Sequence, residues 1–235
     1  MLRYISIWIS FFMILAVFIT VGWHVSSTRR DILSAPPSYL RVGETYIYNG
    51  EPRRGNATHI EVYGTWKGLP VTEISANAFR DFKRLVSVTL PSTITVINDR
   101  AFQGCESLVS ITIPNSVHTI GNRAFQDCTA LEEIILPNAL TRIDGWTFMN
   151  CVLLTEIIIP QNVSDIGIQA FANCIAIAFV TLRFDGVVRI TANTFEGCDS
   201  LEEFLVPANV LSDYYTAPAE LNWKSFADEW MIFPL

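Results

Sequence analysis

The sequence predicts an α/β solenoid, a right-handed coil of short parallel strands and single helical turns, preceded by an N-terminal transmembrane helix. Three observations predict it: a phenylalanine recurs every 23 or 24 residues, all five cysteines follow three residues behind such a phenylalanine, and a proline marks another fixed place. A constant period of this length is typical of stacked repeats. The phenylalanines are Phe79, Phe102, Phe125, Phe148, Phe171 and Phe195, and the cysteines are Cys105, Cys128, Cys151, Cys174 and Cys198.

One repeat shows which element each part predicts. In "LVSITIPNSVHTIGNRAFQDCTA", residues 108–130, Ile111 and Ile113 alternate as the inward side chains of a short strand. Pro114 ends that strand, because proline has no N–H for a ladder. A second extended stretch ends at a glycine, and residues 122–128 then supply about one helical turn with Phe and Cys on one side.

Stacking is what makes such a coil stable. A single coil cannot bury its apolar face, but successive coils can bury theirs against one another. Their strands would then lie about 4.8 Å apart in a parallel sheet, wound with the right-handed sense of strand crossovers. The expected core is a set of ladders in which Leu lies on Leu, Phe on Phe and Cys on Cys.

The chain divides by composition around this repeat. The sequence "TYIYNGEPRRGNATHIEVYG", residues 45–64, predicts a hairpin that opens the domain, and Pro36-Pro37 stiffens the linker before it. The predicted parts are a short tail at 1–3, a membrane anchor at 4–23, a linker at 24–45, an N-terminal cap with the hairpin at 46–70, about six repeats at 71–206 and a C-terminal cap at 207–235.

Residues 4–23, "YISIWISFFMILAVFITVGW", contain no formal charge and are long enough to cross a bilayer as a helix. A signal peptide cleaved after Ser27 is the alternative and would give a secreted form, although signal peptides usually have shorter apolar cores. Either segment carries the remaining chain across a membrane. Arg3 and the terminal amine on one side nearly balance Arg29 and Arg30 on the other, so the charges hardly determine the membrane orientation. We expect the repeats on the extracytoplasmic side, because long domains translocate regardless of charge.

The repeat quoted above resembles the BspA-type leucine-rich repeat, a 23-residue class found on bacterial and protist surfaces. The resemblance extends over about residues 60–233. It is weaker over 177–198, where one residue is inserted, and Phe82 takes the place of the first cysteine. Relatives of this kind bind host or matrix proteins. The resemblance therefore implies a surface protein that mediates adhesion or recognition by protein–protein contact.

Composition argues against several other functions. The net charge of −7 and the scattered basic residues do not fit nucleic-acid binding. Motifs of hydrolases and phosphate-binding loops are absent from the sequence, so no enzyme activity, cofactor or small-molecule substrate is expected. The cysteines lie one coil apart, which does not suit zinc. The Cα atoms of cysteines in neighbouring coils would lie about 5 Å apart, which permits disulfides. The preferred interpretation is that the thiols are unbridged and buried as part of the hydrophobic core.

The outward face of the strand sheet is the candidate site. Two side chains in each strand point away from the core, and in the later coils these are large, apolar or acidic. The candidate partner-binding residues are Glu133, Ile135, Glu156, Ile158, Phe179, Thr181, Glu203 and Leu205. They predict a contact for a protein with apolar and basic groups. The alternative is that they are ordinary strand-surface residues of a structural or envelope spacer that binds nothing specific.

Two sequons complete the candidate sites. Asn56 and Asn162 each begin an Asn-x-Ser/Thr triplet. They would carry N-linked glycans if the organism is a eukaryote and the domain is lumenal.

Overall fold

The computed structural model describes residues 39–50, 57–191, 193–215 and 231–234. The predicted anchor at 4–23 and the linker up to residue 38 lie outside these residues. Among the residues that are described, no helix combines the length and the apolar character needed to cross a bilayer.

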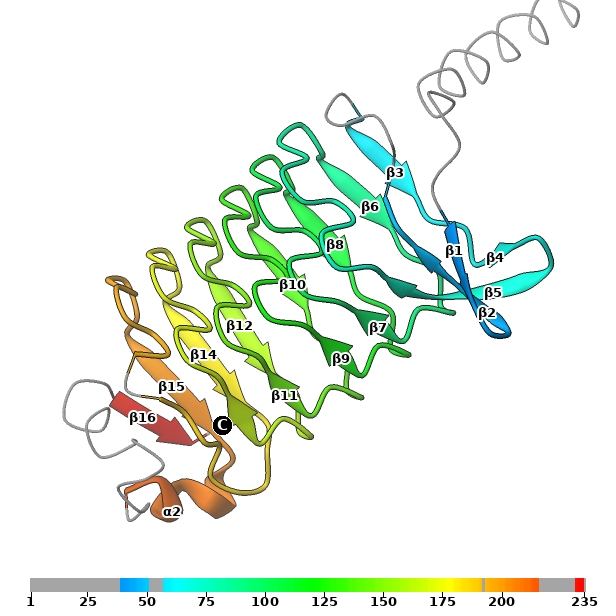
Figure 1. Ribbon diagram of the computed structural model, residues 1–235. Coiled ribbons are helices and arrows are strands. Elements are labelled where there is room, and N and C mark those ends of the chain that lie inside the picture. The colour runs from blue at the N-terminus through cyan, green and yellow to red at the C-terminus, as the bar shows by residue number, and fades with distance from the viewer. Residues whose placement is uncertain (1–38, 51–56, 192, 216–230, 235) are drawn as a thin grey trace, which may run out of the picture. The chain divides into compact units, whose positions relative to one another are not determined.

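The described chain is a β-solenoid whose coils stack in register (Figure 1). One strand of each coil contributes to a face that we call the strand face, and neighbouring strands of this face that pair are parallel. The 23-residue period sets the register, since Glu133 pairs with Ser110 and Phe179 with Glu156. The strands of this face are β3 (His59–Glu61), β6 (Ser87–Thr89), β8 (Ser110–Thr112), β10 (Glu133–Ile135), β12 (Glu156–Ile159), β14 (Phe179–Leu182), β15 (Glu203–Val206) and β16 (Met231–Pro234).

A second parallel ladder, in which most strands have only two residues, lies on another side of the coils (Figure 1). Its strands correspond to the second extended stretch of the predicted repeat. Isoleucine ends most of them and is buried, as at Ile97, Ile120 and Ile143. The strands are β5 (Leu69–Ile74), β7 (Val96–Ile97), β9 (Thr119–Ile120), β11 (Arg142–Ile143) and β13 (Asp165–Ile166), and the two-residue β4 (Thr65–Trp66) pairs with β5.

The predicted hairpin at 45–64 is wrong. Its two strands do not pair with each other: β2 (Thr45–Tyr48) joins β5 in parallel, and β3 joins β6 in parallel. The segment is therefore a first coil of the solenoid. The antiparallel hairpin lies earlier, where β1 (Tyr39–Val42), inside the predicted linker, pairs with β2. Gly43, with φ of 59°, supplies the left-handed residue of its turn.

The predicted helical turn is also wrong. Residues 122–128 form consecutive β-turns, because the amides of Ala124, Gln126 and Cys128 each donate to the carbonyl three residues before them. Arg123 and Asp127 have φ of 58° and 61°, which an α-helix cannot accommodate. The same two places have positive φ in most coils, and the second is always Asp, Asn or Gly: Asp81, Gly104, Asp127, Asn150, Asn173 and Gly197.

These turns free every second amide for the neighbouring coil. The amides of Arg123, Phe125 and Asp127 donate to carbonyls of the next coil at 2.9 to 3.2 Å. A helix would satisfy its amides internally. The turn side of the solenoid thus has its own ladder of hydrogen bonds between coils, in addition to those of the two strand ladders.

A column of aromatic rings runs through the core and confirms the predicted phenylalanine ladder. Adjacent rings from Phe79 to Phe195 are stacked, with centroids 4.7 to 5.5 Å apart and planes within 10° of parallel. Tyr48 extends the column into the first coil, 5.0 Å from Phe79. All of these rings except Phe195 have no exposed surface. The column therefore links every coil to its neighbours.

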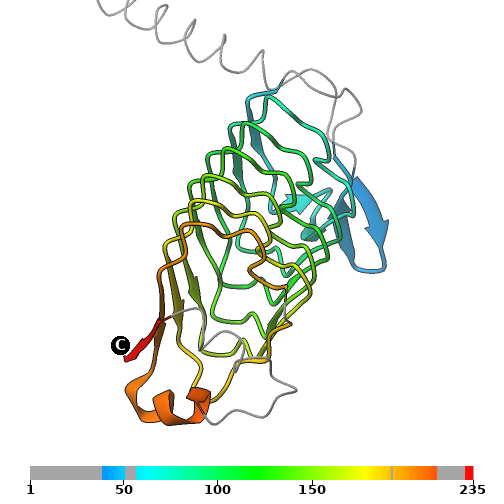
Figure 2. The ribbon, with the colours of Figure 1, turned by 90° about the vertical axis from the view of Figure 1, so that its left-hand side faces the viewer.

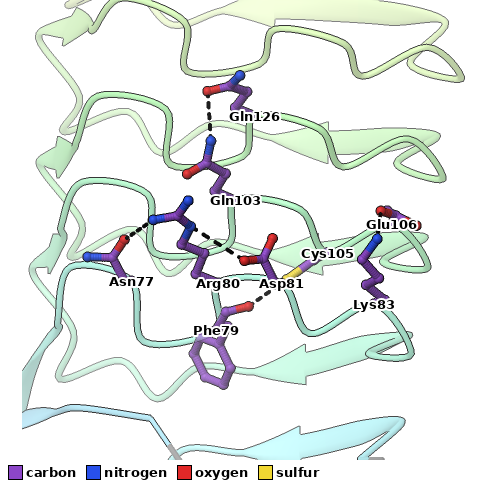
Figure 3. A network of polar contacts seen from close by, with 9 residues as sticks. All are labelled: Asn77, Phe79, Arg80, Asp81, Lys83, Gln103, Cys105, Glu106 and Gln126. Atoms are coloured by element: carbon purple, nitrogen blue, oxygen red, sulfur yellow. Dashed lines mark hydrogen bonds and ion pairs between the residues drawn. The ribbon is translucent and has the colours of Figure 1, made fainter. Parts of the chain in front are cut away.

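The five cysteines are buried and unbridged, in agreement with the preferred interpretation. Each Sγ donates a hydrogen bond of 3.0 to 3.3 Å to the carbonyl of the phenylalanine in the preceding coil. Figure 3 shows this contact for Cys105 and Phe79. Burial raises the pKa of Cys105 and Cys198 to about 12, and it also raises that of the other three thiols. Thiols held protonated in this way react poorly.

The C-terminal segment closes the described solenoid. A 3-10 turn, η1 (Ala208–Val210), leads into the short helix α2 (Leu211–Tyr215), and β16 then pairs in parallel with β15. Tyr214 on α2 is buried, and its hydroxyl donates to the carbonyl of Gly186 at 3.0 Å. This hydrogen bond fastens the cap to the coil that contains the inserted residue.

We predict that Phe125→Ala lowers the free energy of unfolding by about 3 to 5 kcal/mol, because it leaves a cavity in the middle of the ring column. Urea denaturation of the full-length chain measures the loss. Thr112→Ala, on the exposed strand face, is the control and should change stability by less than about 0.5 kcal/mol. Equal effects of the two substitutions would contradict the ring column as the stabilising core.

Candidate partner-binding face

The strand face presents alternate side chains of each strand outward, as predicted. In β8, β10 and β12 the first and third residues are exposed and the second is buried. The five predicted residues on β10, β12 and the start of β14 are exposed: Glu133, Ile135, Glu156, Ile158 and Phe179. Thr181, Glu203 and Leu205 are only half-buried. The last two lie on β15, which has strands on both sides because β16 covers its outer edge.

Large apolar side chains form an exposed row on this face. Ile135 is 77% exposed, Ile158 is 40% exposed and Phe179 is 39% exposed. The coils nearer the N-terminus carry Ser or Thr at the same places, as at Ser110 and Thr112. Exposed rows of this kind have no role in the core of the solenoid, and contiguous apolar surface commonly marks a contact site.

A shallow depression of about 490 Å³ lies on the same face, at β8, β10 and β12. The sequence indicated the outward side chains of these strands, including Glu133 and Glu156. It did not indicate Val109, Leu153 or Thr155. These residues precede β8 and β12, and the alternation of inward and outward side chains assigns a direction only within a strand. The available signal was that Val109 and Leu153 are large apolar residues close to the start of a predicted strand. The lining residues are Val109, Ser110, Glu132, Glu133, Leu153, Thr155 and Glu156.

The carboxylates of the depression have no ion-pair partner among the residues that the structure describes. In the described part of the chain, Glu132, Glu133 and Glu156 form no ion pair within 4.0 Å. Carboxylates elsewhere do, since Lys83 contacts Glu106 at 2.6 Å (Figure 3). Strands β10 and β12 are neighbours, so Glu133 and Glu156 bring like charges to adjacent strands. Such an arrangement slightly destabilises a sheet.

Other candidate chemistry has less support. Across the described residues, no group of three or more His, Cys, Asp or Glu side chains is placed to hold a metal ion. Asn162 is exposed, and its Nδ2 donates to the carbonyl of Asn138 at 2.7 Å. Asn56 lies outside the described residues. Glycosylation of either asparagine stays a prediction.

The repeat signature decides the family. The BspA type leucine rich repeat region matches in six copies over residues 72–202, which is more than half of the chain. The chain belongs to this family. No curated protein matches it. The six copies extend from within β5 to the residue before β15, whereas the first coil, with β2 and β3, precedes the matched region.

Solved structures of bacterial leucine-rich repeat proteins are similar to this chain. The leucine rich repeat protein TpLRR of T. pallidum is 27% identical, with a TM-score of 0.67 over 85% of this chain and 97% of that one. A leucine-rich repeat protein of Bacteroides ovatus is 30% identical, with a TM-score of 0.66 over 74% of this chain. The match spans 47% of the B. ovatus chain, about half of its length.

We predict that two adjacent substitutions in β10 of this leucine-rich repeat protein have different effects. Ile134 is 8% exposed and faces the core, so Ile134→Thr should cost about 1 to 3 kcal/mol. Ile135 faces solvent, so Ile135→Thr should change stability by less than about 0.5 kcal/mol. Thermal or urea unfolding of both variants measures this. A large loss for Ile135→Thr would mean that its side chain supports the fold and is not available to a partner.

Proposed function

We propose that this leucine-rich repeat protein is anchored in a membrane by residues 4–23, is displayed on the extracytoplasmic side, and mediates protein recognition or adhesion through its strand face. Membership in the family supports protein–protein contact as the general role. The uncharged segment at 4–23 supports the anchor. A secreted form after signal cleavage differs only in the N-terminus.

The exposed apolar row carries the proposal. Ile135, Ile158 and Phe179 lie on strands that occupy equivalent places in consecutive coils. A coil needs no large apolar side chain at these positions, because Ser and Thr occupy them in the earlier coils at the same register. Leaving them in water lowers solubility, and a partner that covers them gains free energy from their burial.

We predict that a photoreactive amino acid at position 135 or 158 captures a specific protein on intact cells. The same amino acid in place of the exposed Ile168, which lies on the turn side, should not capture it. Mass spectrometry identifies the captured protein, and its affinity for the purified full-length chain is then measured. Ile158→Glu should abolish that affinity while the chain keeps its unfolding midpoint.

Capture from neither strand-face position would contradict recognition and favour the structural spacer. Display is checked in the same cells with a protease that cannot enter them, which should remove the repeats. The mature N-terminus, determined by sequencing, distinguishes the anchored form from the secreted one.

A further inference from the structure

On β10 and β12, the unpaired carboxylates and the two isoleucines of the apolar row lie in two parallel lines. Glu133 and Glu156 occupy the same place in β10 and β12, and Ile135 and Ile158 follow two residues later. Residues two apart in a strand are separated by about 6.8 Å and point to the same side. On β10 and β12 the face therefore offers two carboxylates and two isoleucines side by side. On β14, Phe179 is the register partner of Glu156 and adds an apolar side chain at the acidic place.

The carboxylates are the charged groups that the described strands of this face carry. The described strands of the face contain no lysine or arginine. Residues 37–130 carry nine basic and eight acidic side chains, whereas residues 131–235 carry four basic and fourteen acidic ones. Residues 131–190, whose coils carry the apolar row, hold six acidic and three basic side chains, and residues 191–235 hold eight acidic and one basic side chain. The C-terminal half of the sequence is therefore acidic, most strongly after the coils that carry the apolar row. Negative charge of this kind attracts partners of the opposite charge.

We propose that the partner of the strand face is a protein that presents an extended segment with alternating cationic and apolar side chains, laid across β8 to β15. This inference rests on the proposed function. Lysine or arginine side chains would enter the depression beside Glu132, Glu133 and Glu156, where Val109 and Leu153 cover their aliphatic stems. The apolar side chains would lie on the row that contains Ile135 and Ile158.

The dimensions of the face set the length of that segment. Four steps separate β8 from β15, and each step is about 4.8 Å, which gives about 19 Å. An extended chain advances about 3.3 Å per residue, so about six residues cover the face. Alternate side chains of such a segment point to opposite sides, which matches one acidic and one apolar line.

The test uses the full-length chain in phosphatidylcholine nanodiscs and a fluorescein-labelled hexapeptide of alternating lysine and leucine. Fluorescence anisotropy measures binding, and the signal from empty nanodiscs is subtracted. We expect binding that weakens as salt rises. An alternating Glu-Leu hexapeptide and an alternating Lys-Ser hexapeptide should each bind at least about tenfold more weakly, because they lack the cations or the apolar side chains.

A matched pair of variants locates the contact. The triple variant Glu132→Gln, Glu133→Gln, Glu156→Gln should bind the Lys-Leu peptide about tenfold more weakly, since each exposed ion pair contributes a factor of about 1.4 to 5. The control variant removes as many exposed carboxylates elsewhere and should bind within about twofold of the unmodified chain. Circular dichroism confirms that both variants fold. The control substitutions are Glu44→Gln, Asp185→Asn and Asp199→Asn.

Two outcomes would overturn the inference. One is equal binding of the Lys-Leu and Glu-Leu peptides, and the other is an equal loss in the two triple variants. The proposed function can survive either result. If a protein is captured from positions 135 and 158 but its contacting segment is neutral or acidic, recognition stands and only the cationic partner is wrong.

Discussion

Register between coils is the constraint on which the rest of this protein depends. Every coil places a phenylalanine ring on the ring below it, and every second amide of its turns donates to the coil beyond. Both ladders are maintained only if successive coils keep equivalent residues at equivalent heights. The insertion at residues 183–186 shows how this is preserved, because Phe195 still stacks 5.2 Å from Phe171. The additional residue is absorbed outside the ladders, between a strand and a turn.

The hydrogen bonds of the cysteines also depend on the register between coils. The carbonyl of Phe79 accepts a hydrogen bond from the Phe82 amide of its own turn and a second from the Cys105 thiol of the next coil. A carbonyl has two lone pairs, so the thiol fills the remaining acceptor position. Alanine at this place could not donate. Phe82 occupies the register where the preceding ring is Tyr48, whose carbonyl instead accepts from the Ser75 amide.

The sequence predicted the fold well where a pattern of side chains specifies the element, as in the strands. It predicted the fold less well where a backbone conformation with positive φ restricts which residues can occur. Alternating isoleucines predicted the strands and the outward positions, and the phenylalanine period predicted the ring column. The turns at 122–128 were mistaken for a helix, because Phe125 and Cys128 also lie on one side of a helical turn. The recurrence of Asp, Asn and Gly at the position of Asp127 was the better guide, since these residues adopt positive φ most readily. Tyr48 was missed because the first coil departs from the repeat.

The stability of the fold and the proposed recognition use different residues of each coil. The ladders use the inward side chains and the backbone, so the outward positions can vary without loss of the fold. Thr112 and Ile135 show this directly, because they are register partners on adjacent strands with the same backbone and very different side chains. The unpaired carboxylates also lie at outward positions. Charges that supported the solenoid would be expected to have partners, as Arg142 and Asp144 do at 2.7 Å. The change of outward residues between β8 and β10 therefore meets no requirement of the ladders, and the proposed recognition of a partner accounts for it.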